Sequence, residues 1–221
     1  MARLGIISSG GPKDAFAERL EQLLGEDVAD IAAAEAGVPM HQLAFEGRNE
    51  ELVRELASPL EDLAQAGADC ALLASVSAHC VQKALADAGT LPLLDLAEAL
   101  RQDVLAQGWR SVFLLGSYRT MKDGFLKRPL ILSHTIVITP NEEEKLWLQH
   151  AVDAVQGGTG EREEMQEHLL EIVSKGREEG AQGLLLASTA LETLAEGLEL
   201  PLPAVMPSVS AAHAFTAFRH V

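Results

Sequence analysis

Residues 67–75, GADCALLAS, recur with few changes as residues 180–188, GAQGLLLAS, and this repeated stretch decides the fold. Glycine, alanine, two leucines, alanine and serine come in the same order in both copies. Each copy reads as the end of a surface helix, a tight turn and a short apolar strand of the kind buried in a parallel sheet. The stretch therefore predicts an α/β protein built from two similar halves.

The serines that end the two copies, Ser75 and Ser188, are the first candidate site residues. In an open parallel sheet, ligands bind beyond the carboxyl ends of the strands, where backbone N–H groups and the next helix meet small polar side chains. If the two halves face one another, the two hydroxyls would approach one small ligand from opposite sides. The alternative is that each serine only caps the helix that follows it.

The composition narrows the class of protein. The chain has 221 residues, of which 48% are hydrophobic and 4% aromatic, which suits one compact unit or two small lobes. Its formal net charge of −16 repels phosphate backbones and anionic lipid. The acidic residues are spread over predicted helix surfaces, so they indicate a solvated surface. We therefore expect neither nucleic acid nor a membrane as partner.

Two cysteines, Cys70 in a predicted buried strand and Cys80 at a helix start, indicate neither a disulfide framework nor a zinc site. The apolar run at residues 4–7 is too short for a signal peptide, and no run of about 18 apolar residues occurs. These features predict a soluble, unprocessed cytoplasmic protein without a metal.

The first half opens with a predicted strand over residues 3–9 and a loop, SSGGP, over residues 8–12. The loop glycines would let the backbone approach a ligand closely, but the loop matches neither a dinucleotide-binding nor a P-loop pattern. An amphipathic helix is expected over residues 13–24. Its inward side chains would be Phe16, Leu20, Leu23 and Leu24.

A second strand is predicted over residues 38–45, and a helix over residues 50–65 with Asn49 as its N-cap. Arg48 would then lie just past the carboxyl end of a strand. There its planar guanidinium would be placed to bind a carboxylate through two hydrogen bonds. The alternative is a solvated surface arginine.

The second half begins as the first does. Its opening strand, residues 111–117, precedes KDGF at residues 122–125, which echoes KDAF at residues 13–16 and indicates duplication of one α/β unit. Asn141 is predicted to cap a helix, and the terminal helix, which carries His213, to pack back on the first half. Further helices are expected over residues 78–88, 96–107, 142–155, 161–179 and 208–220, and further strands over residues 91–95 and 133–139. Residues 201–207 are expected to form a short buried strand or a connection.

Together these segments resemble the aspartate/glutamate racemase superfamily. The resemblance spans nearly the whole chain in the order of that family, and its strength lies in the joint order of the motifs. They are the strand at residues 68–74 with SVSAH at 75–79, LGS at 115–117 before TMKDGF at 120–125, ITP at 138–140, GA at 180–181 with STAL at 188–191, and HA at 213–214.

The resemblance implies an α/β fold of two similar flavodoxin-like lobes, each a three-layer α/β/α unit with a parallel four-stranded sheet. The lobes would be related by a pseudo-twofold axis with the active site in the cleft between them. One lobe would comprise residues 1–96 and 208–221, and the other residues 97–207. It also implies a role in amino-acid metabolism, no cofactor such as pyridoxal phosphate, no metal, and a possible homodimer.

In the family's chemistry, one cysteine thiolate removes a Cα proton and a second thiol delivers a proton to the opposite face, for which thiols suit because their pKa values can be brought near neutrality. The sequence departs from this pattern, because Ser75 and Ser188 stand where the resemblance places those cysteines. A serine hydroxyl is a weak acid that becomes a base or nucleophile only when another group takes its proton. Val76 and Ala190, beside the two serines, also depart from the residues that the family has there. Engineered replacement of the cysteines would leave these neighbours unchanged, so the two serines indicate natural divergence.

Two histidines are candidates to assist the serines. His79 could point back to Ser75 from the first turn of its helix, with Asp95 as a possible orienting acid, although a histidine there also tends to be neutral and structural. His213 matches a family histidine near the second base. The resemblance places further ligand-binding positions at Ser8, Ser9, Gly10, Arg48, Val76, Ser77, Ser117, Thr189 and Ala190.

Three hypotheses follow for a protein that binds a small carboxylate or amino acid. The first is an isomerase or racemase with altered chemistry, in which His79 or His213 acts as base. The second is a catalytically inactive ligand-binding or regulatory homologue. The third is a lyase or hydrolase that uses Ser75 or Ser188 as nucleophile.

Overall fold

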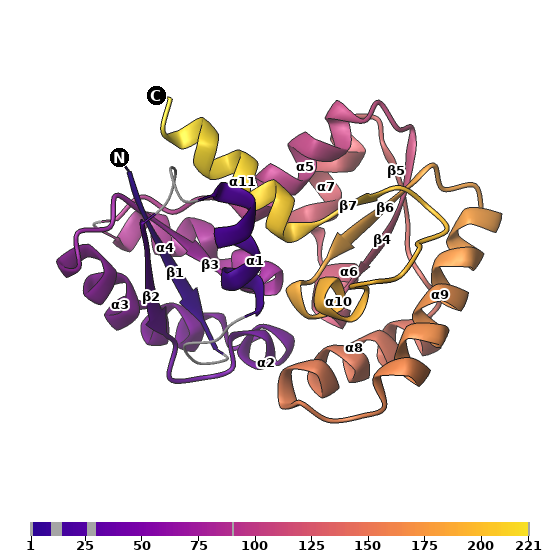
Figure 1. Cartoon of the computed structure of the whole chain (residues 1–221), viewed down its shortest axis with the longest axis horizontal. Helices are drawn as coiled ribbons and strands as arrows, with labels where there is room; N and C mark the ends of the chain where they lie inside the picture. The colour runs from indigo at the N-terminus through magenta and orange to yellow at the C-terminus, as the bar shows by residue number, and fades with distance from the viewer. Residues whose placement is uncertain (1, 10–14, 26–29, 90, 221) are drawn as a thin grey trace. The chain divides into compact units, whose positions relative to one another are not determined.

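A computed structural model describes residues 2–9, 15–25, 30–89 and 91–220. The chain divides into two units, one formed by Met1–Ala99 with Ser208–Val221 and the other by Leu100–Pro207. In Figure 1 the first unit runs from indigo to magenta and includes the yellow C-terminal helix. Among the described residues, no helix is both long enough and apolar enough to cross a bilayer.

The sheet of unit 1 is parallel and has the strand order β2-β1-β3. These strands are β1 (Arg3–Ser8), β2 (Asp30–Glu35) and β3 (Cys70–Leu73). In β1 the residues after Arg3 are all buried, as expected for a central strand covered on both faces.

The expected fourth strand of unit 1, residues 91–95, is reduced to one isolated bridge between Leu93 and Ala71. Ala71 donates its N–H to the carbonyl of Pro92 and accepts from the N–H of Leu94, both at 2.8 Å. Proline has no N–H to extend the pairing. On the other side, Asp95 already caps the next helix by accepting from the N–H of Glu98 at 3.0 Å. The described part of this unit therefore has a three-stranded sheet.

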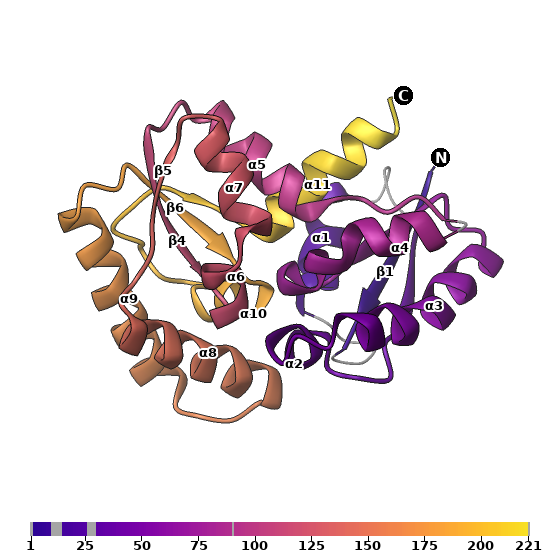
Figure 2. The same cartoon turned by 180° about the vertical axis from the view of Figure 1, so that it is seen from behind.

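The helices of unit 1 lie against its sheet (Figure 2). The longest, α3, buries Leu52, Leu56, Leu60 and Leu63 in a cluster that also contains Ile7 of β1. The helices are α1 (Ala15–Leu24), α2 (Met40–Phe45), α3 (Asn49–Gln65), the 3₁₀ helix η1 (Val76–Val81), α4 (Gln82–Ala88), α5 (Leu96–Ala106), which runs past the unit boundary, and α11 (Pro207–Phe218).

The strand expected over residues 38–45 is wrong. The second strand, β2, lies earlier, and residues 40–45 form the helix α2. Met40, Leu43 and Ala44 are the buried residues of that helix, and their i, i+3, i+4 spacing is helical. Consequently Arg48 follows a helix.

Two smaller features of unit 1 also differ from the sequence prediction. Leu23 is 48% exposed although Phe16, Leu20 and Leu24 of α1 are buried as expected. Asn49 is the first residue of α3, and its predicted cap position is occupied by Arg48, which makes no side-chain cap.

Unit 2 has the expected four-stranded parallel sheet, in the order β5-β4-β6-β7. Its strands are β4 (Ser111–Gly116), β5 (Ile136–Ile138), β6 (Gly183–Ala187) and β7 (Ala204–Val205). Two glycines permit close packing on this sheet. A Cβ on Gly176 would lie 2.3 Å from the Phe113 ring, and one on Gly183 would lie 2.2 Å from the Trp109 ring.

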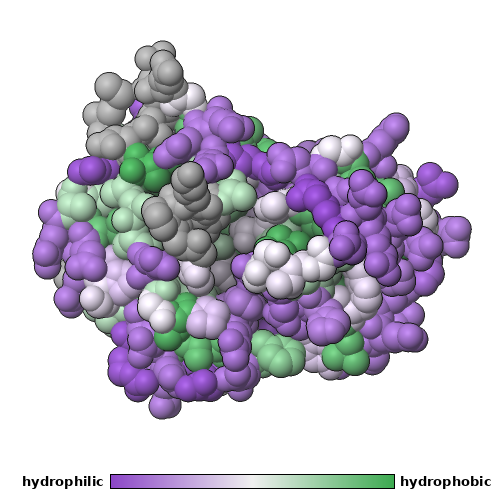
Figure 3. Space-filling model, turned by 60° about the horizontal axis from the view of Figure 1, so that its bottom comes forward, coloured by the Kyte–Doolittle hydropathy of each residue, from purple (hydrophilic) through white to green (hydrophobic). Residues whose placement is uncertain are grey.

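The remaining helices belong to unit 2. They are α6 (Tyr118–Lys122), α7 (Gly124–Leu132), α8 (Glu142–Gly157), α9 (Arg162–Glu178) and α10 (Thr189–Leu194). The prediction of Asn141 as a cap is confirmed, because its side chain accepts from the N–H of Glu144 at 2.9 Å. Glu144 completes a capping box through the N–H of Asn141. The face shown in Figure 3 is mostly hydrophilic, in keeping with the acidic composition.

Candidate functional site at the strand ends

Ser75 follows β3 in an extended conformation, with φ −144° and ψ 112°, and the chain then enters the 3₁₀ helix η1. Its hydroxyl makes no helix cap. Instead, its Oγ lies 3.2 Å from the Oγ of Ser77, and both side chains are buried. One of the two hydroxyls donates to the other, so one O–H proton of the pair has no acceptor among the described residues.

His79 is fixed at the same exit, but through the backbone. Its Nδ1 lies 3.0 Å from the carbonyl oxygen of Ser75. A carbonyl only accepts, so Nδ1 carries the hydrogen and, in the neutral ring, Nε2 is an acceptor. Nε2 is buried and has no hydrogen-bond partner among the described residues. The imidazole thus contacts the backbone of Ser75 and not its hydroxyl.

The electrostatic surroundings of His79 favour the neutral ring. Burial lowers the pKa of His79, since desolvation disfavours the imidazolium, and the negative charge of Asp95 opposes that shift. Asp95 itself uses Oδ1 to cap α5. The expected orienting acid therefore acts on His79 through its charge.

The end of β1 contributes Ser8 and Ser9. Ser8 is buried, and its carbonyl accepts from the N–H of Ala36 at 2.8 Å. The Oγ of Ser9 accepts from the N–H of Met40 at 3.0 Å, which satisfies a backbone donor at the start of α2. Gly10 lies outside the described residues.

Arg48 holds two carboxylates of its own chain. Its Nη1 lies 2.9 Å from Glu46, and its Nε and Nη2 lie 2.7 Å and 2.6 Å from the two oxygens of Glu51. These hydrogen bonds raise the pKa of Arg48, and the bond from Arg48 lowers the pKa of Glu46. The arginine is exposed and follows a helix, so it is not the free anchor past a strand end that the sequence predicted.

At the exit of β6, Ser188 is the N-cap of α10 and its Oγ accepts from the N–H of Leu191 at 3.3 Å. The capping alternative therefore holds for Ser188 and fails for Ser75. The hydroxyl proton of Ser188 is not used in this bond. Thr189 is half-buried and Ala190 is buried in the first turn of α10.

The exit of β4 is a third hydroxyl cluster. Ser117 caps α6 by accepting from the N–H of Thr120 at 3.3 Å, and its Oγ lies 2.9 Å from Thr120 Oγ1. Gly116 is required there, because a Cβ would lie 2.8 Å from the carbonyl oxygen of Ala187. Thr120 was not predicted as a site residue, although it opens the TMKDGF motif at residues 120–125. Buried Gln149, whose Oε1 accepts from the N–H of Tyr118 at 2.9 Å, was not predicted either.

Two further predicted site residues, Val76 and His213, lie on helices of unit 1. Val76 is buried at the start of η1. His213 is exposed on α11 in unit 1, whereas Ser188 belongs to unit 2. Among the described residues, no group of three or more His, Cys, Asp or Glu side chains is arranged to hold a metal ion.

Comparison with known proteins decides the family, because the Asp/Glu/Hydantoin racemase model matches residues 13–216. The chain belongs to the Asp/Glu/Hydantoin racemase family. The predicted resemblance is thus confirmed at the level of the family.

Solved structures of racemase-like proteins share the α/β fold with two parallel sheets. A candidate Asp/Glu racemase from Yersinia pestis is 22% identical with a TM-score of 0.79, and each chain is covered in full. An aspartate racemase from Picrophilus torridus is 18% identical with a TM-score of 0.81, covering 100% of this chain and 95% of that one. An aspartate racemase homologue from Pyrococcus horikoshii OT3 is 20% identical with a TM-score of 0.73, again over both full chains. At these identities the likeness shows the fold alone.

Proposed function

We propose that this racemase-family protein binds a small carboxylate or amino acid at the carboxyl ends of its parallel strands, without two-thiol proton transfer. One observation carries the proposal. The exits of β3, β4 and β6 each leave one hydroxyl proton without an acceptor among the described residues, from the Ser75–Ser77 pair, the Ser117–Thr120 pair and Ser188. A buried O–H that lacks an acceptor is costly, so a ligand that brings acceptor oxygens would be stabilised there.

The same hydrogen bonds argue against the family's usual chemistry. A serine needs a base to take its proton. Among the described residues, the hydroxyls of Ser75 and Ser188 contact only another hydroxyl and a backbone N–H. The thiol of Cys70 lies within β3, where burial raises its pKa to about 12. These features favour the binding homologue over the Ser-dependent lyase or hydrolase.

The test is proton NMR of the purified protein in D₂O with a panel of amino acids and small dicarboxylates. We expect ligand line broadening without loss of the Cα–H signal. Ser75→Ala and Ser188→Ala should each reduce the broadening. Ser174→Ala is the matched control, because that hydroxyl donates to the carbonyl of Leu170 within α9. No broadening with any member of the panel would contradict the proposal.

A second candidate is an isomerase in which His79 is the base. Its neutral ring and its Nε2 acceptor without a partner favour this candidate. It predicts exchange of the Cα proton with solvent that is lost in His79→Gln and retained in His213→Gln. Exchange that survives His79→Gln would contradict it.

A further inference from the structure

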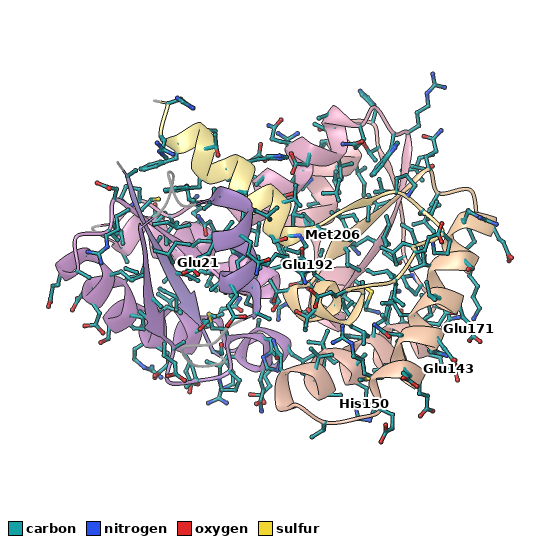
Figure 4. All side chains as sticks on the ribbon, in the orientation of Figure 1. Glu21, Glu143, His150, Glu171, Glu192 and Met206 are labelled. Carbon is teal, nitrogen blue, oxygen red and sulfur yellow. The ribbon has the colours of Figure 1, made fainter. Side chains whose placement is uncertain are left out.

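A groove of about 660 Å³ lies in unit 2 and is lined by residues of α8, of α9 and of the connection between them at residues 159–161. Its volume is within the range of small-molecule sites. None of its lining residues belongs to the strand exits described above. Figure 4 labels His150 on α8 and Glu171 on α9, one lining residue from each helix.

The lining of the groove includes apolar and aromatic side chains. Trp147, Ala151 and Met165 are among them. The Trp147 ring lies 4.3 Å from the ring of His168 at an interplanar angle of 56°. Trp147 is only partly buried. This surface suits the methylene chain of a ligand, and the face of an indole attracts organic cations.

The charged lining of the groove is of one sign. Five carboxylates line it and the lining contains no lysine or arginine; the five are Asp153, Glu161, Glu164, Glu167 and Glu171. Arg162, next in sequence, is directed elsewhere, since its Nη2 lies 2.7 Å from the carbonyl oxygen of Thr193 and 4.0 Å from Glu196. Among the described residues, no cation pairs with Glu161, Glu164 or Glu167. Of the other two carboxylates, Glu171 lies 3.3 Å from Nδ1 of His168 and Asp153 accepts from Nε2 of Gln149 at 2.8 Å. The negative charge of the groove that has no cationic partner among the described residues is therefore that of Glu161, Glu164 and Glu167.

We propose that the α8–α9 groove binds a linear organic polycation of the polyamine class. The methylene segments would lie over Trp147 and Met165, and the ammonium groups would lie against the carboxylates. A bare divalent cation fits less well, because the described residues hold no group of three metal-ligating side chains. The proposal is independent of the strand-end site and would stand if that site bound nothing.

Isothermal titration of the full chain with spermidine at fixed ionic strength tests the proposal. We expect saturable binding of one spermidine per chain. Trp147→Leu should weaken it about fivefold, as expected for loss of a cation–π contact. Glu164→Gln combined with Glu167→Gln should weaken it about tenfold, because two carboxylates of the groove are neutralised.

The matched control is Glu163→Gln combined with Glu178→Gln. It removes the same charge from α9 at exposed positions outside the groove lining. Binding by this control should stay within twofold of wild type. Equal losses in the two double variants, or full competition by Mg²⁺ at matched ionic strength, would overturn the proposal in favour of diffuse electrostatic attraction. An absence of saturable heat would overturn it outright. Circular dichroism checks that each variant is folded. If Trp147→Leu is unstable, the comparison of the Glu164/Glu167 double variant with the Glu163/Glu178 double variant still decides the outcome.

Discussion

The exits of β3 and β6 have nearly the same sequence but use their serines differently. Ser188 caps an α-helix through the N–H of Leu191, whereas Ser75 precedes a 3₁₀ helix and contacts Ser77. The difference comes from the residues that follow. His79 takes the carbonyl of Ser75 with its ring N–H, and no corresponding histidine follows Ser188. A repeated strand therefore fixes where a serine lies, and the next four residues fix what its hydroxyl does.

The largest expected effect on the free energy of unfolding comes from a substitution within the repeated strand. Cys70 in β3 corresponds there to Gly183 in β6. Gly183→Ala would place a Cβ 2.2 Å from the Trp109 ring, so we expect the free energy of unfolding to fall by about 3 kcal/mol through overpacking. Cys70→Ala, which removes only a buried thiol, should cost about 1 kcal/mol.

Urea unfolding can separate these two effects. Trp109 and Trp147 both belong to unit 2, so tryptophan fluorescence reports on Gly183→Ala. Far-UV circular dichroism follows both units. An equal fall in the free energy of unfolding for the two substitutions would contradict the prediction, because it would mean that a side chain added at Gly183 is not overpacked.

The second prediction concerns His79. His79→Gln should lower the free energy of unfolding by about 2 kcal/mol at pH 7, because a buried ring and its bond to the Ser75 carbonyl are lost. The pKa of His79 is lowered by folding, so the unfolded chain binds the proton more readily. The stabilisation by the neutral ring is therefore complete above the ordinary pKa of 6.5 and declines as the pH falls below it.

Urea unfolding of wild type and His79→Gln at pH 5, 6, 7 and 8 measures this dependence. The difference between the two proteins should narrow below pH 6.5. Gln107→Ala, a substitution of an exposed side chain that does not titrate, is the control, and the difference between it and wild type should not change with pH. A difference for His79→Gln that grows on acidification would mean that the folded protein holds the charged ring.

The third prediction tests the cap. Ser188→Ala should lower the free energy of unfolding by about 1 kcal/mol, the usual loss when an N-cap hydroxyl is removed. Ser188→Asp keeps an oxygen that can accept the cap hydrogen bond, so its free energy of unfolding should be close to that of wild type. Tryptophan fluorescence during urea unfolding measures both variants. A loss in Ser188→Ala that Ser188→Asp does not recover would point to tight packing of the serine in place of capping.

The features that the sequence predicted correctly are those that depend on local signals, such as the periodicity of apolar residues and the residues that cap helices. The two copies of the repeat, the Asn141 cap and the long helices α3 and α9 rest on periodicity and capping, and they were found within a few residues. The strand predicted over residues 38–45 is wrong because the buried residues of α2 have helical spacing, which in a helix of six residues covers less than two turns and gives a weak periodic signal. The ion pairs of Arg48 with Glu46 and Glu51 were not predicted, because Glu50 is also close in sequence and spacing alone does not decide which carboxylates the guanidinium binds.

At the candidate site, the sequence located both serines and offered the cap that Ser188 makes, but it did not predict the contact of Ser75 with Ser77. The tautomer of His79 depends on which oxygen its ring meets, and that is a matter of three-dimensional placement. The α8–α9 groove was missed for a similar reason. Most of its lining residues are exposed or only partly buried and come from two helices and the connection between them, whereas hydrophobic periodicity identifies the buried face of each helix.

The smallest effect concerns the hydroxyl pair that replaces the cap at the β3 exit. Ser75→Ala leaves the buried Ser77 hydroxyl without its partner, and Ser77→Ala does the converse. The double variant removes both groups and should cost less than the sum of the single variants, with a coupling of about 0.5 kcal/mol. Ser188→Ala combined with Ser77→Ala is the comparison, and those losses should add, because the Ser188 hydroxyl is bonded to Leu191 instead. Urea unfolding supplies all the values. Additive losses at Ser75 and Ser77 would mean that their hydroxyls stabilise the exit separately, and the two exits would then differ only in the helix that each one begins.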